Sequence, residues 1–339
     1  MNIYTDGTVI VNHGGTEMGQ GLNTKMLQVA VSELGVTPDK VKVTATNTSK
    51  VPNTSATAAS SGSDLNGMAV KNAIDALKSR IAVLVTGEFD SLYQGKKTLP
   101  ENLVFEDNQV YDKLSPDRKI SFKEISSLAY LKQVSLSSTG FYRTPGIHFD
   151  KNTGQGNPFY YYVFGMSVSE VLVDTLTGQH ELLRTDILQG TGDSINEGID
   201  RGQIEGGFVQ GIGWCTTEEI KWDESGRLLM DSPDKYKIPT VNDIPVKFRV
   251  EMLKNAPNPG TILKSKAVGE PPFMLAFSVW LAIKDAVSAV DNHQTEPEFS
   301  LPSTYEVILF SAEKLRTIAA SKNLTTKEII KNEGSIITD

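Results

Sequence analysis

The sequence predicts an α+β protein built from two similar subdomains, each joining a mixed sheet to packed helices. Short runs with the alternating apolar pattern of strands are interleaved with longer runs that have helical spacing. Three glycine-rich loops, at 14–21, 190–213 and 268–272, stand where a predicted strand gives way to a predicted helix. We expect the three loops to converge on one cleft, because loops at such junctions often form ligand sites.

The chain opens with a predicted β-hairpin. Asp6-Gly7 stands between two strand-like runs, and both residue types tolerate the positive φ of a tight turn. After the first glycine-rich loop, apolar residues recur at helical spacing and predict a helix, with Asn23 or Thr24 available as its N-cap. The run "VKVTAT" at 41–46 then predicts a short strand.

Residues 47–67 are a long run of small polar residues with two open interpretations. Composition alone favours a flexible linker. The run nevertheless leads into "LNGMAVKNAIDALKSRIAVLV", which predicts a helix that Ser63 or Asp64 can cap. Small hydroxyl residues would then gather at a helix N-terminus, where free N–H groups attract phosphate or polar ligands.

The middle of the chain predicts a long hairpin followed by a glycine-rich helix. Residues 100–150 predict hairpins and one short helix, and we assign no site to them. Alternation around Leu176-Thr177-Gly178 predicts the long antiparallel hairpin. Each glycine inside the next helix costs ~0.5–1 kcal/mol relative to alanine. The compensation is either tight helix packing or close approach to a bulky cofactor, and the glycines concerned are Gly202, Gly206, Gly207 and Gly211.

Glu270 is the one ionisable residue of the third loop. It stands between Val268 and an apolar run that begins at Phe273, and Pro271-Pro272 suits the first turn of a helix. One interpretation makes Glu270 a partner of the helix dipole. The other makes it a buried general base whose affinity for protons is raised by loss of water.

Composition excludes several classes of site and partner. The chain has 339 residues, of which 39% are apolar and 22% charged, and its net charge of −8 argues against nucleic acid or an anionic membrane as partner. A single cysteine, Cys215, cannot form an internal disulfide or an iron–sulfur site, and four scattered histidines predict no metal held by side chains. We expect no membrane-spanning segment of ~18–20 apolar residues and cytoplasmic residence.

Several motifs together carry a family resemblance. They are "HGGTEMGQGL", "VPNTSATAASSGSDLNG", "GFYRTP", "IDRGQIEGGFVQGIGW", "YKIPT" and "SKAVGEPP", in this order from residue 2 to about residue 290. The chain resembles the xanthine dehydrogenase family of molybdenum hydroxylases, and in particular the C-terminal half of the molybdopterin-binding subunit of bacterial members. Taken singly, the loops are weak signals that do not fit nucleotide-binding fingerprints.

The resemblance implies a molybdopterin cofactor and a set of site residues. The loops 14–21 and 53–62 would hold the cofactor, and the small residues there allow close backbone approach and donate hydrogen bonds to an anionic phosphate. Glu270 matches the family's catalytic glutamate, a general base for hydroxylation of an electron-poor carbon. The residues that match cofactor contacts are Met18, Gly19, Gln20, Thr57, Ala59, Ser60, Ser61, Gln203, Val268 and Gly269.

The resemblance also implies three divisions of the chain and further modules outside it. Residues 1–150 and 151–291 would be the two molybdopterin-binding subdomains, whereas the tail at 292–339 matches nothing in the family. Asn23 and Gly62 are minor departures from the family pattern. The iron–sulfur and FAD modules and the N-terminal half would lie outside this chain, which alone should be inactive, and the complete enzyme should be an oligomer.

The function implied is oxidation of xanthine or hypoxanthine, with electrons passed to the iron–sulfur and FAD modules. Two alternatives stay open: an aldehyde oxidase-type molybdenum hydroxylase, and a truncated fragment without catalysis. Pro271-Pro272 after Glu270 favours the purine substrate, because aldehyde-oxidising relatives often vary at these positions.

Overall fold

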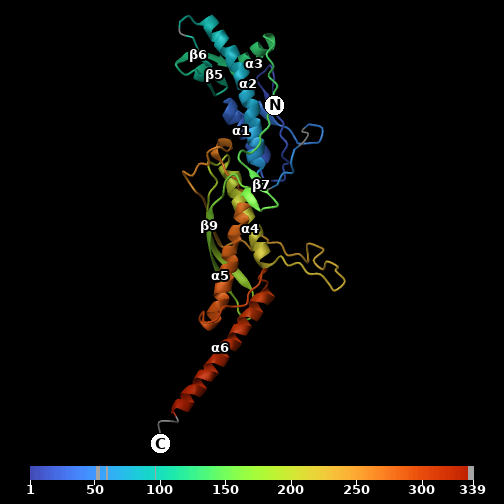
Figure 1. Ribbon diagram of the computed structural model, residues 1–339, viewed down its shortest axis with the longest axis vertical. Helices are drawn as coiled ribbons and strands as arrows, with labels where there is room; N and C mark the ends of the chain where they lie inside the picture. Colours follow the sequence, from blue (N-terminus) through green and yellow to red (C-terminus); the bar gives the residue numbers. More distant parts are fainter. Residues whose placement is uncertain (51–53, 59, 96, 335–339) are drawn as a thin grey trace. The chain divides into compact units, whose positions relative to one another are not determined.

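The computed structural model describes residues 1–50, 54–58, 60–95 and 97–334 (Figure 1). The chain divides into two compact units, and each is described by itself. These units are defined by which residues pack together, so their boundaries differ from those of the predicted domains. The division into domains 1–150, 151–291 and 292–339 stays a prediction. The first unit comprises Met1–Val163, Thr191–Asp200 and Lys254–Val268, and the second comprises Phe164–Gly190, Arg201–Leu253 and Gly269–Asp339.

The first unit is built on a three-stranded mixed sheet covered by two helices. The strand order is β1-β2-β3, in which β2 runs antiparallel to β1 and parallel to β3. The helices α1 and α2 follow β2 and β3. A three-stranded antiparallel meander, the short helix α3 and a small hairpin complete the unit. The bounds are β1 Asn2–Ile3, β2 Val9–Val11, α1 Leu22–Leu34, η1 Pro38–Lys40, β3 Val41–Val43, α2 Gly62–Leu92, η2 Pro100–Asn102, β4 Leu103–Glu106, β5 Gln109–Asp112, β6 Ser115–Ser121, α3 Phe122–Leu131, β7 His148–Asp150, β8 Gln155–Asn157 and η3 Ile262–Lys264.

The second unit repeats the same order of elements. Its sheet is β9-β10-β11, with β10 antiparallel to β9 and parallel to β11. Helix α4 follows β10, and α5 follows β11 and packs on β9. In both units two antiparallel strands are followed by a helix, by a third strand parallel to the second, and by another helix. This order confirms the predicted α+β fold of two similar halves. The bounds are β9 Gly165–Val173, β10 His180–Gln189, α4 Glu197–Thr216, β11 Lys247–Met252, η4 Pro271–Ala276, α5 Phe277–Ser288, η5 Ala289–Asp291 and α6 Tyr305–Gly334.

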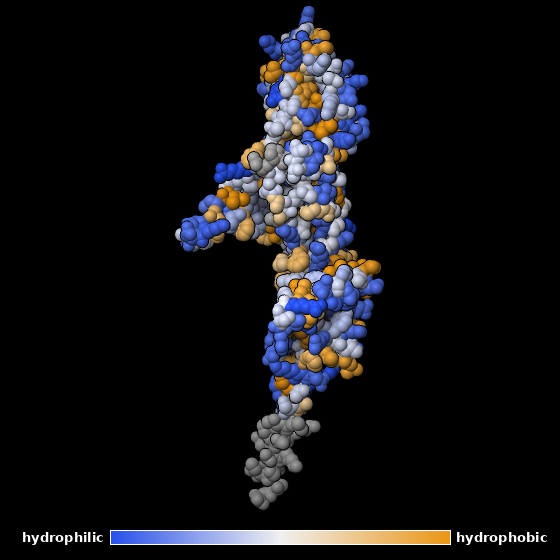
Figure 2. All heavy atoms as spheres, turned by 90° about the vertical axis from the view of Figure 1, so that its right-hand side faces the viewer, coloured by the Kyte–Doolittle hydropathy of each residue, from blue (hydrophilic) through white to orange (hydrophobic). Residues whose placement is uncertain are grey.

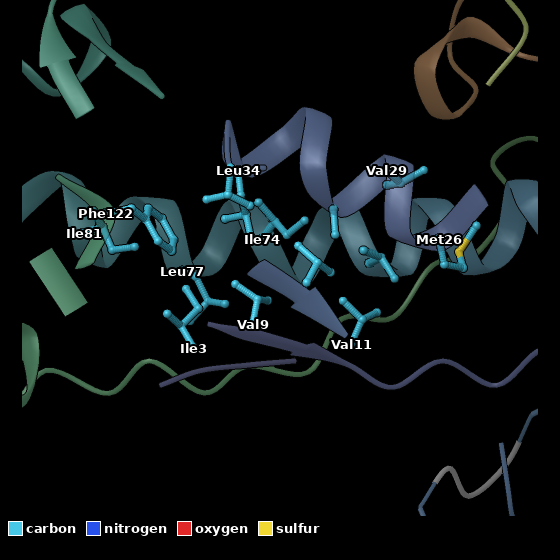
Figure 3. Close-up of a cluster of buried hydrophobic side chains, with 14 of the residues drawn as sticks. Ile3, Val9, Val11, Met26, Val29, Leu34, Ile74, Leu77, Ile81 and Phe122 are labelled. Carbon is cyan, nitrogen blue, oxygen red and sulfur yellow. The ribbon is translucent and has the colours of Figure 1, made fainter. Parts of the chain in front are cut away.

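The core of the first unit lies between its sheet and its two long helices. Apolar side chains from β1 and β2 meet those of α1 and α2, and Phe122 at the start of α3 joins them (Figure 3). Burying one such side chain fully contributes ~1.5–3 kcal/mol. The residues labelled there are Ile3, Val9, Val11, Met26, Val29, Leu34, Ile74, Leu77, Ile81 and Phe122.

Two predicted turns and one predicted helix have the local chemistry expected of them. Gly7, with φ +83°, closes the first hairpin, and Gly178, with φ +76°, closes the hairpin of β9 and β10. Helix α3 begins with a capping box, in which the Ser121 hydroxyl accepts from the Glu124 N–H and the Glu124 carboxylate accepts from the Ser121 N–H. The structure confirms the two turns and the helix. They could be predicted because residues close in sequence determine them.

The expectation that no apolar run is long enough to span a membrane is wrong by length and composition. Residues Pro271–Asp291 form one helical stretch of mean hydropathy 1.6 that meets both criteria. Within the second unit, however, α5 packs on β9, and Lys284 and Asp285 lie in its middle. One face of α5 therefore covers a sheet, whereas Met274 and Leu281 of the same stretch are exposed. On the face drawn in Figure 2, hydrophobic and hydrophilic residues are intermixed.

Tight packing explains two of the four glycines of α4 that the sequence analysis singled out. A Cβ on Gly211 would clash with the Phe273 carbonyl oxygen, and one on Gly207 would lie 3.3 Å from the Gly269 carbonyl oxygen. Gly202 and Gly206 have no described atom within 4 Å of such a Cβ. Tight packing therefore accounts for Gly207 and Gly211, and the described residues give no such reason for Gly202 and Gly206.

This difference predicts opposite effects for two matched substitutions in one helix. Gly211→Ala should destabilise the chain by ~1–3 kcal/mol because the added methyl group has no room. Gly206→Ala should stabilise it by ~0.4–1 kcal/mol, because alanine restricts the unfolded chain and fits the helix. Urea unfolding of both variants measures the contrast, and equal effects would show that α4 is not packed against the segment before α5.

Candidate functional site

In the first unit, two glycine- and serine-rich loops leave the same edge of the sheet. Val11 and Val43 are paired at the ends of the parallel strands β2 and β3, so the loops 12–21 and 44–61 start side by side. Ligands bind preferentially at such carboxyl ends of parallel strands. The second unit repeats this arrangement, because Gln189 and Met252 are paired at the ends of β10 and β11.

Hydrogen bonds tie the first two loops together. The Thr16 N–H donates to Thr57 Oγ1 at 2.8 Å, and the Gly14 N–H donates to Asn66 Oδ1 at 3.1 Å. His13 is buried and accepts from the Gly15 N–H through Nδ1, so its Nε2–H donates to Asn23 Oδ1 at 2.8 Å. Burial holds the pKa of His13 below its usual value. Asn23, a departure from the family pattern, therefore has a defined partner here.

Glu17 caps the helix that follows the first loop. One carboxylate oxygen accepts from the N–H groups of Gly19 and Gly21, and the other accepts from the Asn23 N–H at 2.9 Å. Loss of water works to raise the pKa of Glu17, but these three backbone bonds outweigh it and hold the pKa below its usual range. The predicted caps Asn23 and Thr24 are wrong, because the helix begins earlier, at Leu22, with Gly21 in the N-cap position.

The N-terminus of α2 has no such cap. The helix begins at Gly62, before the predicted caps Ser63 and Asp64, and its N-cap Ser61 makes no side-chain capping bond. The N-cap residue of this 31-residue helix thus supplies no side-chain acceptor to the first-turn N–H groups. Such an end favours a negatively charged group.

A cavity of about 640 Å³ adjoins this helix end. The first loop lines it through Gly14 and Gly15, and the second through Thr57, Ser61 and Gly62. Lys50 adds a cation, and residues 137–142 line it as well. Uncapped N–H groups, hydroxyls and a lysine fit a phosphate-bearing cofactor, and this cavity is large enough for a small organic group.

Most predicted contacts of the first unit lie on these two loops. Met18 is 67% exposed, and Gly19, with φ +102°, has no described atom near a would-be Cβ. The Gln20 side chain accepts from the Met18 N–H and donates to the Thr16 carbonyl oxygen, so it shapes its own loop. Ser60 has a positive φ of 52°. Ala59 lies outside the described residues.

In the second unit, the packing of α4 brings Gln203 and Gly269 to one region. Gln203, Gly207 and Gly211 recur every four residues and so share one face of the helix. Gly207 approaches Gly269 and Pro272 on this face. Glu270 follows at the N-cap position of η4, where its side chain does not cap the helix.

Glu270 is exposed, which differs from the expectation that its apolar neighbours bury it. Val268 is buried, but it belongs to the first unit, and Met274 is 52% exposed. The described residues of the chain therefore do not supply the dry surroundings that favour a general base. Among these residues, no group of three His, Cys, Asp or Glu side chains is placed to hold a metal ion.

A buried polar network in the first unit was missed by sequence reasoning. Lys25 Nζ donates to Asp200 Oδ1 at 2.5 Å, and Ser194 Oγ donates to Asp200 Oδ2 at 2.5 Å. The Tyr161 hydroxyl donates to Asp64 Oδ2 at 2.5 Å and accepts from the Ala267 N–H at 2.8 Å. One signal was present, since Lys25 stands three residues after Leu22 and so shares its buried helix face.

Burial raises the pKa of Asp64 to about 6 from an ordinary 3.8, against the opposing effects of Tyr161 and Lys25. Tyr142 also interacts with this carboxylate. The pKa of Asp64 is higher in the folded chain than in the unfolded chain, so its protonated form favours folding. This contribution to the unfolding free energy is fully present below pH 3.8 and is lost as the pH rises through about 6.

Asp64→Asn should therefore remove part of the pH dependence of stability. Relative to this variant, the wild-type chain should lose about 2 kcal/mol of unfolding free energy between about pH 4 and about pH 7. Urea unfolding of both proteins at the two pH values measures it. A difference that stays constant, or grows in favour of the wild type at higher pH, would show that Asp64 is not desolvated.

Comparison with known proteins shows which family the chain belongs to. Residues 1–245 match the family described as the molybdopterin cofactor-binding domain. The chain is 43% identical over 314 residues to xanthine dehydrogenase of Dictyostelium discoideum, covering 91% of this chain and 21% of that protein. It is also 43% identical to xanthine dehydrogenase/oxidase of Gallus gallus, again over 91% of this chain and 21% of the relative.

Solved structures of related enzymes share the fold. Quinoline 2-oxidoreductase from Pseudomonas putida 86 matches 92% of this chain with a TM-score of 0.78 and 25% identity, and the match covers 37% of that chain. The chain thus spans about a fifth of the length of the curated relatives it matches. From the domain match and these identities, the chain belongs to the molybdopterin cofactor-binding domains of the xanthine dehydrogenase family.

Proposed function

We propose that this chain is part of a molybdenum hydroxylase that oxidises xanthine or hypoxanthine. The main support is that the motif Gly269-Glu270-Pro271-Pro272 lies beside the glycine face of α4 in a chain 43% identical to xanthine dehydrogenases. The relatives are about five times as long as the matched segment, so the substrate and the electron acceptor depend on modules beyond it.

The residues of the first unit would hold the anionic end of the cofactor. Thr57 and Ser61 line the cavity at the uncapped end of α2, and Lys50 adds positive charge. The backbone at Gly19 is open to close approach. In the second unit, Gln203 and Gly269 would contribute from α4 and the η4 junction. Once bound, molybdopterin would supply the redox chemistry and accept two electrons from the substrate.

Glu270 would act as the general base. Its carboxylate is exposed at the start of η4, where it can reach a group outside the chain. We infer that the desolvation needed for base catalysis comes from the cofactor, the substrate and the remaining modules, since the residues described around Glu270 leave it exposed. Pro271 and Pro272 restrict the backbone after Glu270 and so fix where its side chain begins.

An aldehyde substrate is the second candidate. Aldehyde oxidoreductase from Desulfovibrio gigas shares the fold with a TM-score of 0.67 and 25% identity over 92% of this chain. The 43% identity to xanthine dehydrogenases favours the purine. Comparing kcat/KM for xanthine and for a simple aldehyde in the complete enzyme decides between them. Iron–sulfur and FAD modules as electron acceptors, an oligomeric enzyme and cytoplasmic residence are parts of the same proposal.

The 339-residue chain alone should show no appreciable xanthine oxidation. Positioning of substrate and catalytic groups supplies several kcal/mol of an enzymatic rate enhancement, and most of the relatives' length is absent from this chain. The test supplies the purified chain with xanthine and an artificial electron acceptor, beside the complete enzyme as positive control. Robust turnover by the chain alone would show that it carries a full catalytic centre, contrary to the proposal.

A further inference from the structure

We propose that Lys25, Asp64, Tyr161 and Asp200 are positioning residues that hold the cofactor loops at a fixed spacing. This inference rests on the proposed function, because it assigns the network a role in cofactor retention. Its four members and the bonded Ala267 N–H all belong to the first unit.

Three members, Lys25, Asp64 and Asp200, and the bonded Ala267 each stand directly beside a different loop, at a position called here the root of that loop. Lys25 lies in the first turns of α1, just after the loop 14–21, and Asp64 lies in the first turn of α2, three residues after Ser61. Asp200 lies in the first turn of α4, at the end of the segment Thr191–Asp200. Ala267 directly precedes Val268 and Gly269. Residues of the network and its bonded Ala267 therefore stand beside each loop that the family resemblance assigns to the cofactor.

Tyr161 connects two of these roots through one oxygen atom. Its hydroxyl donates to Asp64 and accepts from the Ala267 N–H, so the start of α2 and the approach to Glu270 share one side chain. Neighbouring bonds fix the same segment, because the Lys266 N–H donates to the Thr191 carbonyl oxygen at 2.7 Å and Ser265 bridges to Gly192. The backbone before Val268 is thus held on two sides.

Lys25 connects the other two roots. Its ammonium group pairs with Asp200, and both side chains are at least 92% buried, with relative exposures of 8% and 2%. The same cation acts electrostatically on Asp64. The buried Lys25 ammonium group therefore attracts two carboxylates, Asp200 and Asp64, that stand beside different loops. Such a pair adds little net stability but specifies a geometry, since any displacement exposes a buried charge to an apolar surrounding.

Asp64 is the weakest point of this network. Its Oδ1 atom is buried and has no hydrogen-bond partner among the described residues, whereas Oδ2 is held by Tyr161. Because one bond orients the whole carboxylate, loss of the Tyr161 hydroxyl should release both Asp64 and the Ala267 N–H. If the Tyr161 ring only filled space, replacing it with phenylalanine would leave Asp64 and the Ala267 N–H in place.

The experiment compares Tyr161→Phe with Tyr162→Phe in the complete enzyme. Tyr162 is the matched control, because the residue is 63% exposed and its backbone oxygen keeps its bond from the Lys266 ammonium group. Hydrogen exchange of the peptide that contains Ala267 reports on the loop, and the molybdenum content after dialysis reports on cofactor retention. Asp64→Asn keeps an acceptor for Tyr161, whereas Asp64→Leu removes it and provides a second route if Tyr161→Phe does not fold.

We expect exchange at Ala267 to accelerate about fivefold in Tyr161→Phe and Asp64→Leu, which is the effect of losing one hydrogen bond of ordinary strength. The molybdenum content should fall by about half or more in both, with Tyr162→Phe and Asp64→Asn close to wild type. Unchanged exchange would overturn the network, and accelerated exchange with full molybdenum retention would overturn its role toward the cofactor. Neither readout depends on Glu270, so failure of the proposed catalytic role would appear separately.

Discussion

Glu270→Gln is expected to lower the turnover of the complete enzyme by at least ~10²–10⁴-fold, the range typical of a missing general base. Glutamine keeps the shape of the side chain and removes its ability to accept a proton. The molybdenum content and the substrate KM should stay near those of the wild type, because the substitution leaves the cofactor loops in place. Single-turnover reduction of the cofactor by xanthine measures the chemical step directly.

The alternative role of Glu270 predicts a different outcome. If its carboxylate only stabilised the start of η4 and α5, the substitution would remove ~0.3–1 kcal/mol of stability and leave turnover nearly intact. The exposed Glu181, at the start of β10, provides a control that should leave turnover unchanged when it is replaced by glutamine. Rapid reduction in Glu270→Gln would contradict the catalytic assignment, and a drop in molybdenum content alone would indicate a folding defect.

Lys25→Met should destabilise the chain by ~3–5 kcal/mol, because it leaves the Asp200 carboxylate buried without its cation. Methionine retains most of the volume of lysine, so a cavity does not explain the loss. Urea unfolding of the chain measures it. Lys71→Met is the control, since Lys71 pairs with Asp75 and Glu33 while its side chain stays 33% exposed, and the change should alter stability by no more than ~1 kcal/mol.

A double variant separates the charge from the packing. Lys25→Met combined with Asp200→Leu removes both buried charges and should recover much of the stability lost by Lys25→Met alone. If the double variant is as unstable as the sum of the two single variants, the ion pair does not couple the residues as the structure indicates.

The sequence predicted those parts of the fold that neighbouring residues determine. The Asp6-Gly7 turn, the hairpin closed by Gly178 and the short helix after Ser121 depend on contacts within a few residues. The repeated order of strands and helices followed from hydrophobic periodicity and from glycine-rich loops at the junctions. The parallel pairings of β2 with β3 and of β10 with β11 agree with this order, because a helix separates each pair.

Contacts between distant residues were not predictable in the same way. Lys25 and Asp200 are 175 residues apart, and Tyr161 and Asp64 are 97 apart, so no local pattern links them. The cap of α1 was missed because a carboxylate from Glu17, outside the helix, replaces the expected side chains. The site residues came from family resemblance, since glycine-rich loops alone do not distinguish close packing from ligand binding.

The most direct test is an experimental structure of the complete enzyme with its cofactor. We predict that loops 14–21 and 53–62, together with Gln203 and Gly269, contact one bound molybdopterin, with its phosphate near the uncapped start of α2. Glu270 should face the substrate side of the same group. A structure that places Gln20, Ser60 and Gln203 on unrelated surfaces, or the cofactor away from them, would contradict this account.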